Sequence, residues 1–255
     1  MRRIQLFPAA FYLLTLPVSV AANDWTWTIT PYAFLADVHV DVKHNDEQII
    51  SSDITLSELI DDLESAIIFH VEGKGDRHGV FADFYFNDYG ANPKMFDQGG
   101  QVIEAKSDEK VWIIDLGGVY YPGKDSSGFG IRYGVRMIKF DDEIDIVSVN
   151  GVPTNQRIFD ASKTFVDGLL GFHYDKRFTD DWSFLIVGDA STGDTELVWN
   201  VQGLFGYHFG ARDQYAVRFG YRHMDFELKS DDGLGNKIAI DMDWSGPVVG
   251  FSFTF

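Results

Sequence analysis

The sequence of 255 residues contains no cysteine, so disulfide bonds and thiolate metal sites are both excluded. It is also poor in basic residues, with 21 Lys and Arg against 39 Asp and Glu, for a formal net charge of −18. Nucleic-acid binding needs a basic surface, so this balance argues against a nucleic-acid partner. Beyond the first 22 residues no run of about 18 apolar residues occurs, and we therefore expect no membrane-spanning helix.

The first 22 residues have the features of an export signal. Arg2 and Arg3 form a short basic region, Ile4–Val20 is largely apolar, and Val20-Ala21-Ala22 offers small residues for cleavage. This arrangement is typical of a secretory signal peptide. We predict that residues 1–22 are removed and that residues 23–255 form a single domain.

The remaining chain is a series of segments in which apolar and polar residues alternate, separated by turn residues. Connections alternate between short and long, as in bacterial barrels with short periplasmic turns and long outer loops. An all-β, closed antiparallel barrel of about ten strands is therefore predicted. Eight or twelve strands are the alternatives, because the first segment and the Asp141–Asp160 connection can each gain or lose a strand. The ten segments are Trp25–Val42, Ala66–Lys74, Gly79–Tyr89, Lys110–Tyr121, Phe129–Phe140, Lys163–Phe178, Trp182–Ala190, Thr195–Phe209, Gln214–Leu228 and Lys237–Phe255.

The two faces of these segments differ in chemistry. In the ninth segment Tyr215 and Phe219 share one face, whereas Arg218 and Arg222 share the other. A transmembrane barrel turns its apolar face to lipid, and a soluble barrel or sandwich with the same period turns it inward. The export signal, the aromatic content of 22 Phe, 11 Tyr and 6 Trp, and the terminal Phe255 favour the transmembrane barrel.

Two stretches depart from simple alternation. In the last segment the apolar residues change parity at Ser245-Gly246-Pro247, where a bulge is predicted because Pro cannot donate to the strand ladder. In Asp53–Glu64, Leu and Ile recur at helical spacing, with Ser52 or Asp53 available as the N-cap. This predicts a short amphipathic helix in the first outer loop, packed within the loop, covering the barrel mouth or lying on the membrane.

Four stretches carry a family resemblance: WTITPYAF at Trp27–Phe34, DITLSELIDDLESAIIFHVEGKGDRHGVFADFYF at Asp53–Phe86, GYRHMDFEL at Gly220–Leu228 and DWSGPVVGFSFTF at Asp243–Phe255. Together they resemble a proteobacterial family of outer-membrane β-barrel proteins whose function is largely unassigned. The last stretch is the most specific of the four. The resemblance implies a single outer-membrane barrel and transfers no catalytic residue.

Charged and polar side chains on the inward face form the candidate site. In a narrow barrel an unpaired charge carries a large desolvation cost, so these groups either pair and close the interior or line a thin wet path. Folding back the strands places Asp115 near Arg132 or Arg136, and Gln202 near Arg222. Lys74, Asp175 and Asp189 share the inward parity. The predicted network comprises Glu72, Asp83, Asp115, Arg132, Arg136, Asp167, Gln202, Arg218, Arg222 and Asp241.

No catalytic, metal or cofactor motif accompanies this network. His223, with Asp225 two residues on, is the position considered for an enzyme acting on lipid or peptide, and it has outward parity. A surface receptor or adhesin would instead use the loops Asp141–Asp160 and Ala91–Glu109. These two functions are the alternatives to the main prediction.

The main prediction is an integral outer-membrane β-barrel that is not an enzyme and needs no cofactor or metal. It acts as a narrow passive channel or as a structural envelope protein with a charged lumen. The expected partners are outer-membrane lipid and lipopolysaccharide, and small solutes if the lumen conducts. The strand that ends at Phe255 is expected to engage the barrel-assembly machinery.

Overall fold

The computed structural model describes residues 25–44, 47–90, 94–98, 101–123, 128–231 and 237–255. Nearly all of these residues lie in antiparallel strands, and one short helix interrupts them. The elements are β1 (Thr26–Phe34), β2 (Asp37–His44), β3 (Glu47–Ile54), α1 (Leu56–Asp62), β4 (Leu63–Lys74), β5 (His78–Gly90), β6 (Lys94–Gln98), β7 (Gln101–Tyr120), β8 (Gly128–Val149), β9 (Val152–Arg177), β10 (Trp182–Gly193), β11 (Leu197–Phe209), β12 (Tyr215–Asp231) and β13 (Lys237–Thr254). The predicted signal peptide lies outside the described residues.

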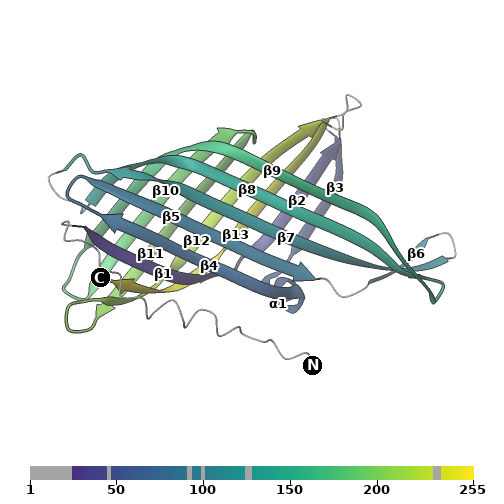
Figure 1. Cartoon of the computed structure of the whole chain (residues 1–255), viewed down its shortest axis with the longest axis horizontal. Helices are drawn as coiled ribbons and strands as arrows, with labels where there is room; N and C mark the ends of the chain where they lie inside the picture. The colour runs from purple at the N-terminus through teal and green to yellow at the C-terminus, as the bar shows by residue number, and fades with distance from the viewer. Residues whose placement is uncertain (1–24, 45–46, 91–93, 99–100, 124–127, 232–236) are drawn as a thin grey trace.

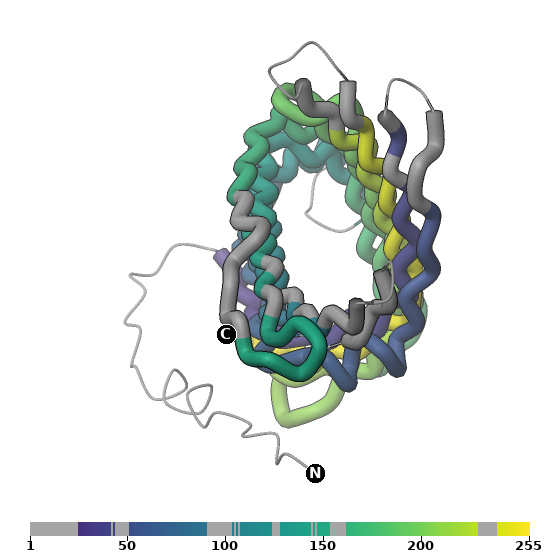
Figure 2. The backbone as a smooth tube through the Cα atoms, turned by 90° about the vertical axis from the view of Figure 1, so that its right-hand side faces the viewer, coloured from purple at the N-terminus to yellow at the C-terminus, as the bar shows by residue number. Residues whose placement is uncertain are grey.

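The strands close into a ring because the last strand, β13, pairs with the first two strands, β1 and β2. β1 pairs with the second half of β13, with Thr28 opposite Thr254, and β2 pairs with its first half, with Ile238 opposite His44. β1 and β2 therefore share one place in the barrel, which has ten strands, as predicted. β3 pairs with β2 and β6 pairs with β7, so these two strands widen the sheet without adding to the ring. Figure 1 shows the tilted strands, and Figure 2 shows the ring along its axis.

The two ends of the barrel differ. Short connections join β4 to β5, β9 to β10 and β11 to β12 at the end where β1 begins and β13 finishes. Barrels of this kind keep their short turns in the periplasm, and we refer to this as the turn end. At the opposite, outer end, β7, β8 and β9 extend well beyond the ring (Figure 1).

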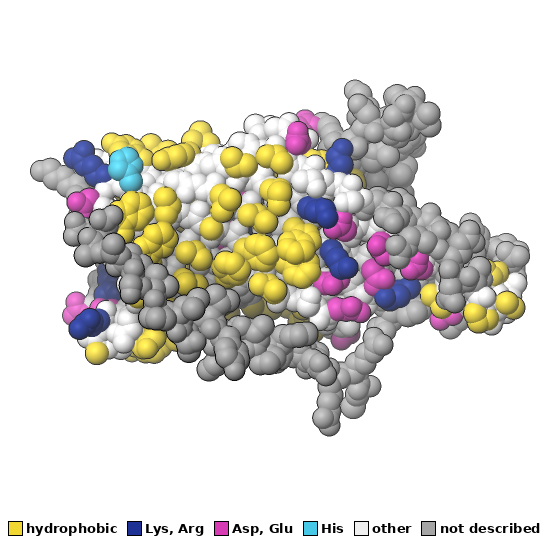
Figure 3. Space-filling model, in the orientation of Figure 1, with side chains coloured by type: hydrophobic (Ala, Val, Ile, Leu, Met, Phe, Trp, Pro, Cys, Tyr) yellow, Lys and Arg dark blue, Asp and Glu magenta, His cyan; other side chains and the backbone are white. Residues whose placement is uncertain are grey.

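A belt of exposed apolar side chains surrounds the half of the barrel next to the turn end, and Figure 3 shows it on one face. Exposed Leu, Val and aromatic side chains on this scale are the signature of a surface in contact with lipid. No described helix has the length and apolar character to cross a membrane. The belt comprises Ile29, Ile67, Val80, Leu116, Tyr120, Phe129, Ile131, Tyr133, Val135, Val166, Leu170, Phe172, Val201, Phe205, Tyr207, Val217, Phe219, Tyr221 and Val249.

Beyond the belt, toward the outer end, the inner face of the strands becomes apolar and the outer face becomes charged. On β12, Met224, Phe226 and Leu228 are buried inside the barrel, whereas Asp225 and Glu227 alternate with them on the outside. The buried apolar residues form an outer core within the barrel, and charged groups gather on the surface around it (Figure 3). The outer core comprises Phe34, Ala36, Tyr85, Val111, Ile113, Ile138, Phe140, Phe165, Val198, Leu204, Met224, Phe226, Leu228, Trp244 and Val248.

This exchange corrects the predicted bulge at Ser245-Gly246-Pro247. The pairing of β12 with β13 runs without a register shift from Tyr215 opposite Phe253 to Asp231 opposite Lys237. The strand keeps its parity while its surroundings change from lipid to water. The apolar residues therefore move from the outer face to the inner face with no change in the backbone.

Two connecting segments also differ from expectation. The helix α1 is present, but its N-cap is Thr55, which forms a reciprocal capping box with Glu58, instead of Ser52 or Asp53. None of its residues is fully buried, and Leu56 and Leu59 are half-buried. The Asp141–Asp160 connection is not a loop, because β8 and β9 continue through it as a hairpin that turns at Asn150 and Gly151.

Candidate functional site

The centre of the lumen is occupied by a fully enclosed arginine. The Arg136 guanidinium donates two hydrogen bonds to the Asp115 carboxylate, at 2.8 and 2.7 Å, and one to Asp189 at 2.8 Å. Asp115 and Arg136 face each other across β7 and β8, and Asp189 comes from β10. The side chain of Arg136 has no exposed surface. Two carboxylates thus hold one buried cation at the level of the belt.

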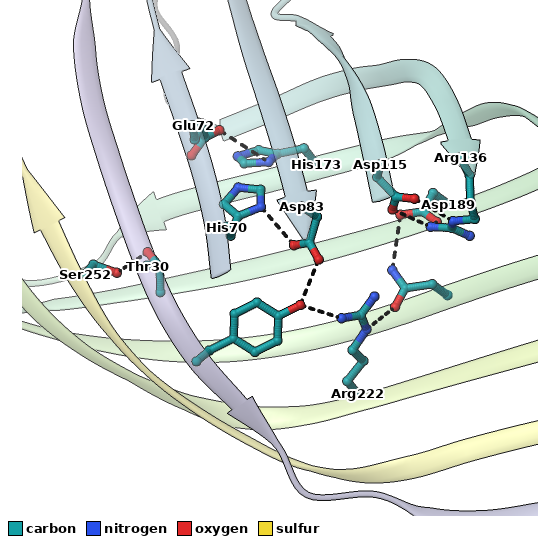
Figure 4. A network of polar contacts seen from close by, with 12 residues as sticks. Thr30, His70, Glu72, Asp83, Asp115, Arg136, His173, Asp189, Arg222 and Ser252 are labelled. Atoms are coloured by element: carbon teal, nitrogen blue, oxygen red, sulfur yellow. Dashed lines mark hydrogen bonds and ion pairs between the residues drawn. The ribbon is translucent and has the colours of Figure 1, made fainter. Parts of the chain in front are cut away.

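Hydrogen bonds continue from this arginine across the barrel (Figure 4). The second Asp189 oxygen accepts from the Asn200 amide at 3.1 Å, and the Asn200 oxygen accepts from Arg222 Nε at 2.8 Å. Arg222 Nη1 donates to the Tyr32 hydroxyl at 3.0 Å, which reaches β1 on the far side of the ring. The chain is therefore continuous from β8 to β1.

The far end of the chain is a carboxylate on β5. Tyr32 donates its hydroxyl proton to Asp83 at 2.8 Å, and the other Asp83 oxygen contacts His70 Nδ1 on β4 at 3.0 Å. We call the whole set the lumen network: Asp115, Arg136, Asp189, Asn200, Arg222, Tyr32, Asp83 and His70.

The network crosses the lumen at the level of the belt, where the outer surface of the barrel is apolar. Removing one partner from a buried ion pair costs about 3–5 kcal/mol, because the other charge is left without a partner. The outer core lies above the network and fills the interior with apolar side chains. Polar contacts and apolar packing together occupy the section of the barrel that a solute would have to cross.

A second set of polar groups lies closer to the turn end, and we call it the lower cluster. Lys74 Nζ contacts Asp175 at 2.6 Å and Glu72 at 3.4 Å. Arg218 Nε donates to Ser252 Oγ at 3.0 Å, and Ser252 also bonds Thr30 at 2.7 Å.

A cavity of about 50 Å³ lies between the lumen network and the lower cluster. Tyr32, Asp83 and His70 of the network line it, and so do Glu72 and Arg218 of the lower cluster. A space of this size holds a few water molecules.

The structure brings most of the predicted residues to the lumen, and of the two partners expected for Asp115 it pairs Arg136 with it. Arg132 does not bind Asp115, and its guanidinium lies over the Phe81 ring at 3.7 Å from the centroid. Gln202 is opposite Arg222 in the register of β11 and β12, yet Arg222 bonds Asn200 instead.

Asp167 and Asp241 have different roles from those predicted. Asp167 is buried and closes the β10–β11 connection, accepting hydrogen bonds from Thr195 N at 3.0 Å and Thr195 Oγ1 at 2.5 Å. The placement of Asp241 in the lumen is wrong, because it lies on the outer surface and pairs with Lys43 at 2.5 Å. Its strand neighbours Ile240 and Met242 pack inward against the outer core.

Four network members are absent from the predicted network: Tyr32, His70, Asn200 and Asp189, of which Asp189 was recognised only by its inward parity. Each lies on the polar face of its strand at the level of the belt. Tyr32, His70 and Asn200 are not Asp, Glu, Lys or Arg, so a pattern of charged residues on that face does not indicate them. The inward parity of all hydrogen-bonding side chains, charged and uncharged, is the signal in the sequence that would have indicated them.

His223 lies on the outside of the barrel, above the belt. Its Nδ1 atom is 2.5 Å from Ser245 Oγ, and its ring lies 4.7 Å from that of Trp199. Within the described part of the chain no group of three or more His, Asp or Glu side chains has a metal-binding arrangement.

Comparison with one solved structure, superposing with a TM-score above 0.5, supports the fold. The outer membrane protease OmpT from Escherichia coli superposes with a TM-score of 0.52 at 11% identity, covering 91% of this chain and 97% of that one. The translocator domain of the autotransporter NalP from Neisseria meningitidis gives a TM-score of 0.49 at 9% identity, over 93% and 90% of the two chains. No protein-family model and no curated protein matches the sequence.

These similarities concern the fold alone, because the identities are low. The structural neighbours are bacterial outer-membrane β-barrel proteins. Combined with the lipid-facing belt, the fold defines the chain as an integral β-barrel of the outer membrane.

Proposed function

We propose that the protein is a structural envelope protein, without enzymatic activity, whose lumen is closed to solutes. The observation that carries this proposal is the lumen network, which links β8 to β4 by way of the opposite wall of the barrel. A passive channel would instead keep its charged groups along a wet wall, apart from one another.

A closed barrel acts through its surfaces. The belt contacts outer-membrane lipid, and the acidic outer end faces lipopolysaccharide, whose phosphates it would meet through divalent cations. During assembly the strand that ends at Phe255 engages the barrel-assembly machinery. These partners are part of the proposal, and they follow from the chemistry of each surface.

Single-channel recording in planar bilayers tests the closed lumen. The wild-type protein is expected to give no conductance steps. Arg222→Ala removes the link between Asn200 and Tyr32, and combined with Phe226→Ala, which thins the outer core, it is expected to produce small steps. Arg177→Ala is the matched control, because Arg177 lies at the exposed rim of the turn end and bonds Asp213 at 2.8 Å. Regular conductance steps from the wild-type protein would show that the lumen is a channel.

An enzyme acting on lipid is the second candidate, and the contact between His223 and Ser245 favours it. A histidine that removes a proton from a serine hydroxyl activates it as a nucleophile, provided a third group orients the ring. Among the described residues no carboxylate hydrogen-bonds to His223, and this is why the structural role is preferred.

Incubation of the folded protein with phospholipid vesicles distinguishes the two functions. Release of fatty acid that is lost in both His223→Ala and Ser245→Ala, with the barrel still folded, would establish the enzyme. The structural role requires that the wild-type protein release none.

A further inference from the structure

The strand β3 has a free edge at the outer end of the barrel (Figure 1). It pairs with β2 and, within the described residues, with no other strand. β2 in turn pairs with Ile238–Ser245 of β13, which lies beyond the belt residue Val249 of the same strand. The unpaired N–H and C=O groups of β3 are therefore outside the membrane, where an extended chain can reach them.

The side chains described along this edge leave room for a neighbouring strand. Ser51 and Asp53 share the outer face of β3 and are exposed, and the Asp53 side chain is 87% exposed. Ser52 is exposed on the inner face, and Ile54 on that face is half-buried. A strand added beside β3 would meet one acidic and one apolar position on opposite faces.

The surroundings of this edge are acidic. From Asn45 to Phe69, which includes all of β3 and α1, the chain contains no Lys, Arg or His. Asp61 and Asp62 of α1, the helix that follows β3, have no ion pair within the described part of the chain. The acidic residues of this stretch are Asp46, Glu47, Asp53, Glu58, Asp61, Asp62 and Glu64.

The bases on the neighbouring strand do not offset these acids. Lys43 of β2 pairs with Asp241 of β13, on the side away from β3, and His39 contacts both Asp53 and Asp41. A second copy of the chain would bring another acidic β3 to the edge, and like charges opposite each other destabilise a strand pair. A strand that carries Lys or Arg meets charges of the opposite sign.

We propose that the free edge of β3 binds a basic, extended segment of another protein, which joins the sheet as a further strand. Backbone hydrogen bonds to β3 supply the affinity, and the alternation of basic with apolar side chains supplies the selectivity. The basic side chains lie on the outer face with Asp53, and the apolar ones lie on the inner face with Ile54. The edge is outside the lumen, so the proposal is independent of whether the lumen is closed.

A synthetic peptide of about ten residues that alternates Lys and Val is the probe. Its binding to the full barrel, held in discs of zwitterionic lipid, is measured by fluorescence anisotropy. The wild-type barrel is expected to bind this peptide at least about tenfold more tightly than a peptide that alternates Glu and Val. Equal binding of the two peptides would overturn the proposal.

Methylation of the peptide backbone separates strand addition from simple attraction between charges. Two versions of the Lys and Val peptide, methylated on the main-chain nitrogens of either Lys or Val, keep the charge, and each blocks one edge of the strand. At least one version is expected to lose binding. If both bind as well as the parent peptide, no backbone pairing occurs and the proposal is wrong.

Hydrogen exchange of the wild-type barrel locates the peptide without any substitution. The peptide is expected to slow exchange in β3 and not in Val152–Phe165, the stretch of β9 that has no partner on its β10 side among the described residues. Slowing in β9 alone would contradict the site. Protection of β3 that rises with protein concentration in the absence of peptide would assign the edge to a second copy and would also overturn the proposal.

Charge reversal tests the acidic surroundings. Asp53→Lys combined with Asp61→Lys is expected to weaken binding of the Lys and Val peptide by about tenfold or more. Asp108→Lys combined with Asp141→Lys is the matched control, because it makes the same change in net charge on β7 and β8.

If the first pair of substitutions prevents folding, Asp61→Lys combined with Asp62→Lys takes its place, since no residue of α1 is fully buried. Equal weakening by the test pair and the control pair would show that net charge alone attracts the peptide, which the proposal does not allow.

Discussion

The belt-level half of the barrel and its outer half are built from the same alternating strands, but the apolar face points outward in the first and inward in the second. At the belt, Phe219 and Tyr221 of β12 face lipid while Arg222 belongs to the lumen network. A few residues later Phe226 is buried in the lumen and Glu227 faces outward. Strand alternation only separates two faces, and the medium outside decides which of them is apolar.

The interiors of the two halves also differ in how they are stabilised. The outer core gains from burial of apolar surface, at about 25 cal/mol per Å². The belt-level interior depends on directional hydrogen bonds between charged groups, and such groups are costly when one partner is missing. Substitutions should therefore have different consequences in the two halves, and four experiments test this difference.

The largest effect is expected at Arg136. Arg136→Met leaves Asp115 and Asp189 buried without their cation, which should lower the free energy of unfolding by about 4 kcal/mol. Urea titration of the barrel in lipid vesicles, followed by tryptophan fluorescence, measures the change. The rim variant Arg177→Met should change it by less than about 1 kcal/mol. Equal effects at the two positions would mean that the network does not stabilise the barrel.

A charge on the outer surface should be tolerated in one half and not in the other. Phe219→Arg places a cation in the belt and is expected to cost about 3 kcal/mol, whereas Glu227→Arg, on the same face of β12 beyond the belt, should cost less than about 1 kcal/mol. Both variants are measured in the same vesicles. A large cost at Glu227 would place the membrane boundary further out than the belt suggests.

The outer core should respond to loss of volume. Met224→Ala removes a side chain that is 1% exposed and should cost about 2 kcal/mol. Val249→Ala, in the belt on the neighbouring strand, serves as the comparison and should cost less, because lipid fills the space that it leaves. The order of the two urea midpoints checks the prediction, and a reversed order would show that the outer core is loosely packed.

The smallest effect concerns pH. Glu109 lies on β7 beyond the belt, opposite Asp142, and the surrounding protein together with the Asp142 charge raises its pKa to about 7. The folded protein therefore holds this proton more tightly than the unfolded chain, whose carboxyl has a pKa of 4.5. The contribution of Glu109 to the free energy of unfolding should be highest below pH 4.5 and fall as the pH rises from 4.5 through about 7.

Glu109→Gln should remove this contribution and raise the urea midpoint at pH 8. Water reaches the Glu109 side chain inside the barrel mouth, so the gain should be smaller than the pKa shift alone implies. Asp181→Asn, in a turn at the opposite end, is the control. An identical pH profile for wild type and Glu109→Gln would refute the assignment.

Most of the fold could be predicted because the strand period is local. Each of the ten segments corresponds to a strand of the ring, with the first divided into β1 and β2. β3 and β6 were missed, since both are short strands outside the ring. The predicted bulge at Ser245-Gly246-Pro247 and the inward placement of Asp241 share one error. Both assumed that the apolar face stays on the same side of the strand along its whole length.

The candidate site was predictable only between adjacent strands. The pairing of Asp115 with Arg136 follows from folding β7 back on β8, and it was among the expected contacts. The contact between Tyr32 and Arg222 joins positions 190 residues apart. No local pattern carries this information, because the contact depends on the tilt and stagger of the whole ring.

The sequence by itself determined the alternating strands, their approximate number and the separation of an apolar face from a polar one, since these depend on neighbouring residues. The tertiary structure alone decided where the membrane ends along each strand and which polar side chains meet across the lumen. Closure of the ring sets the distances between opposite walls, and a one-dimensional pattern of side chains does not contain those distances.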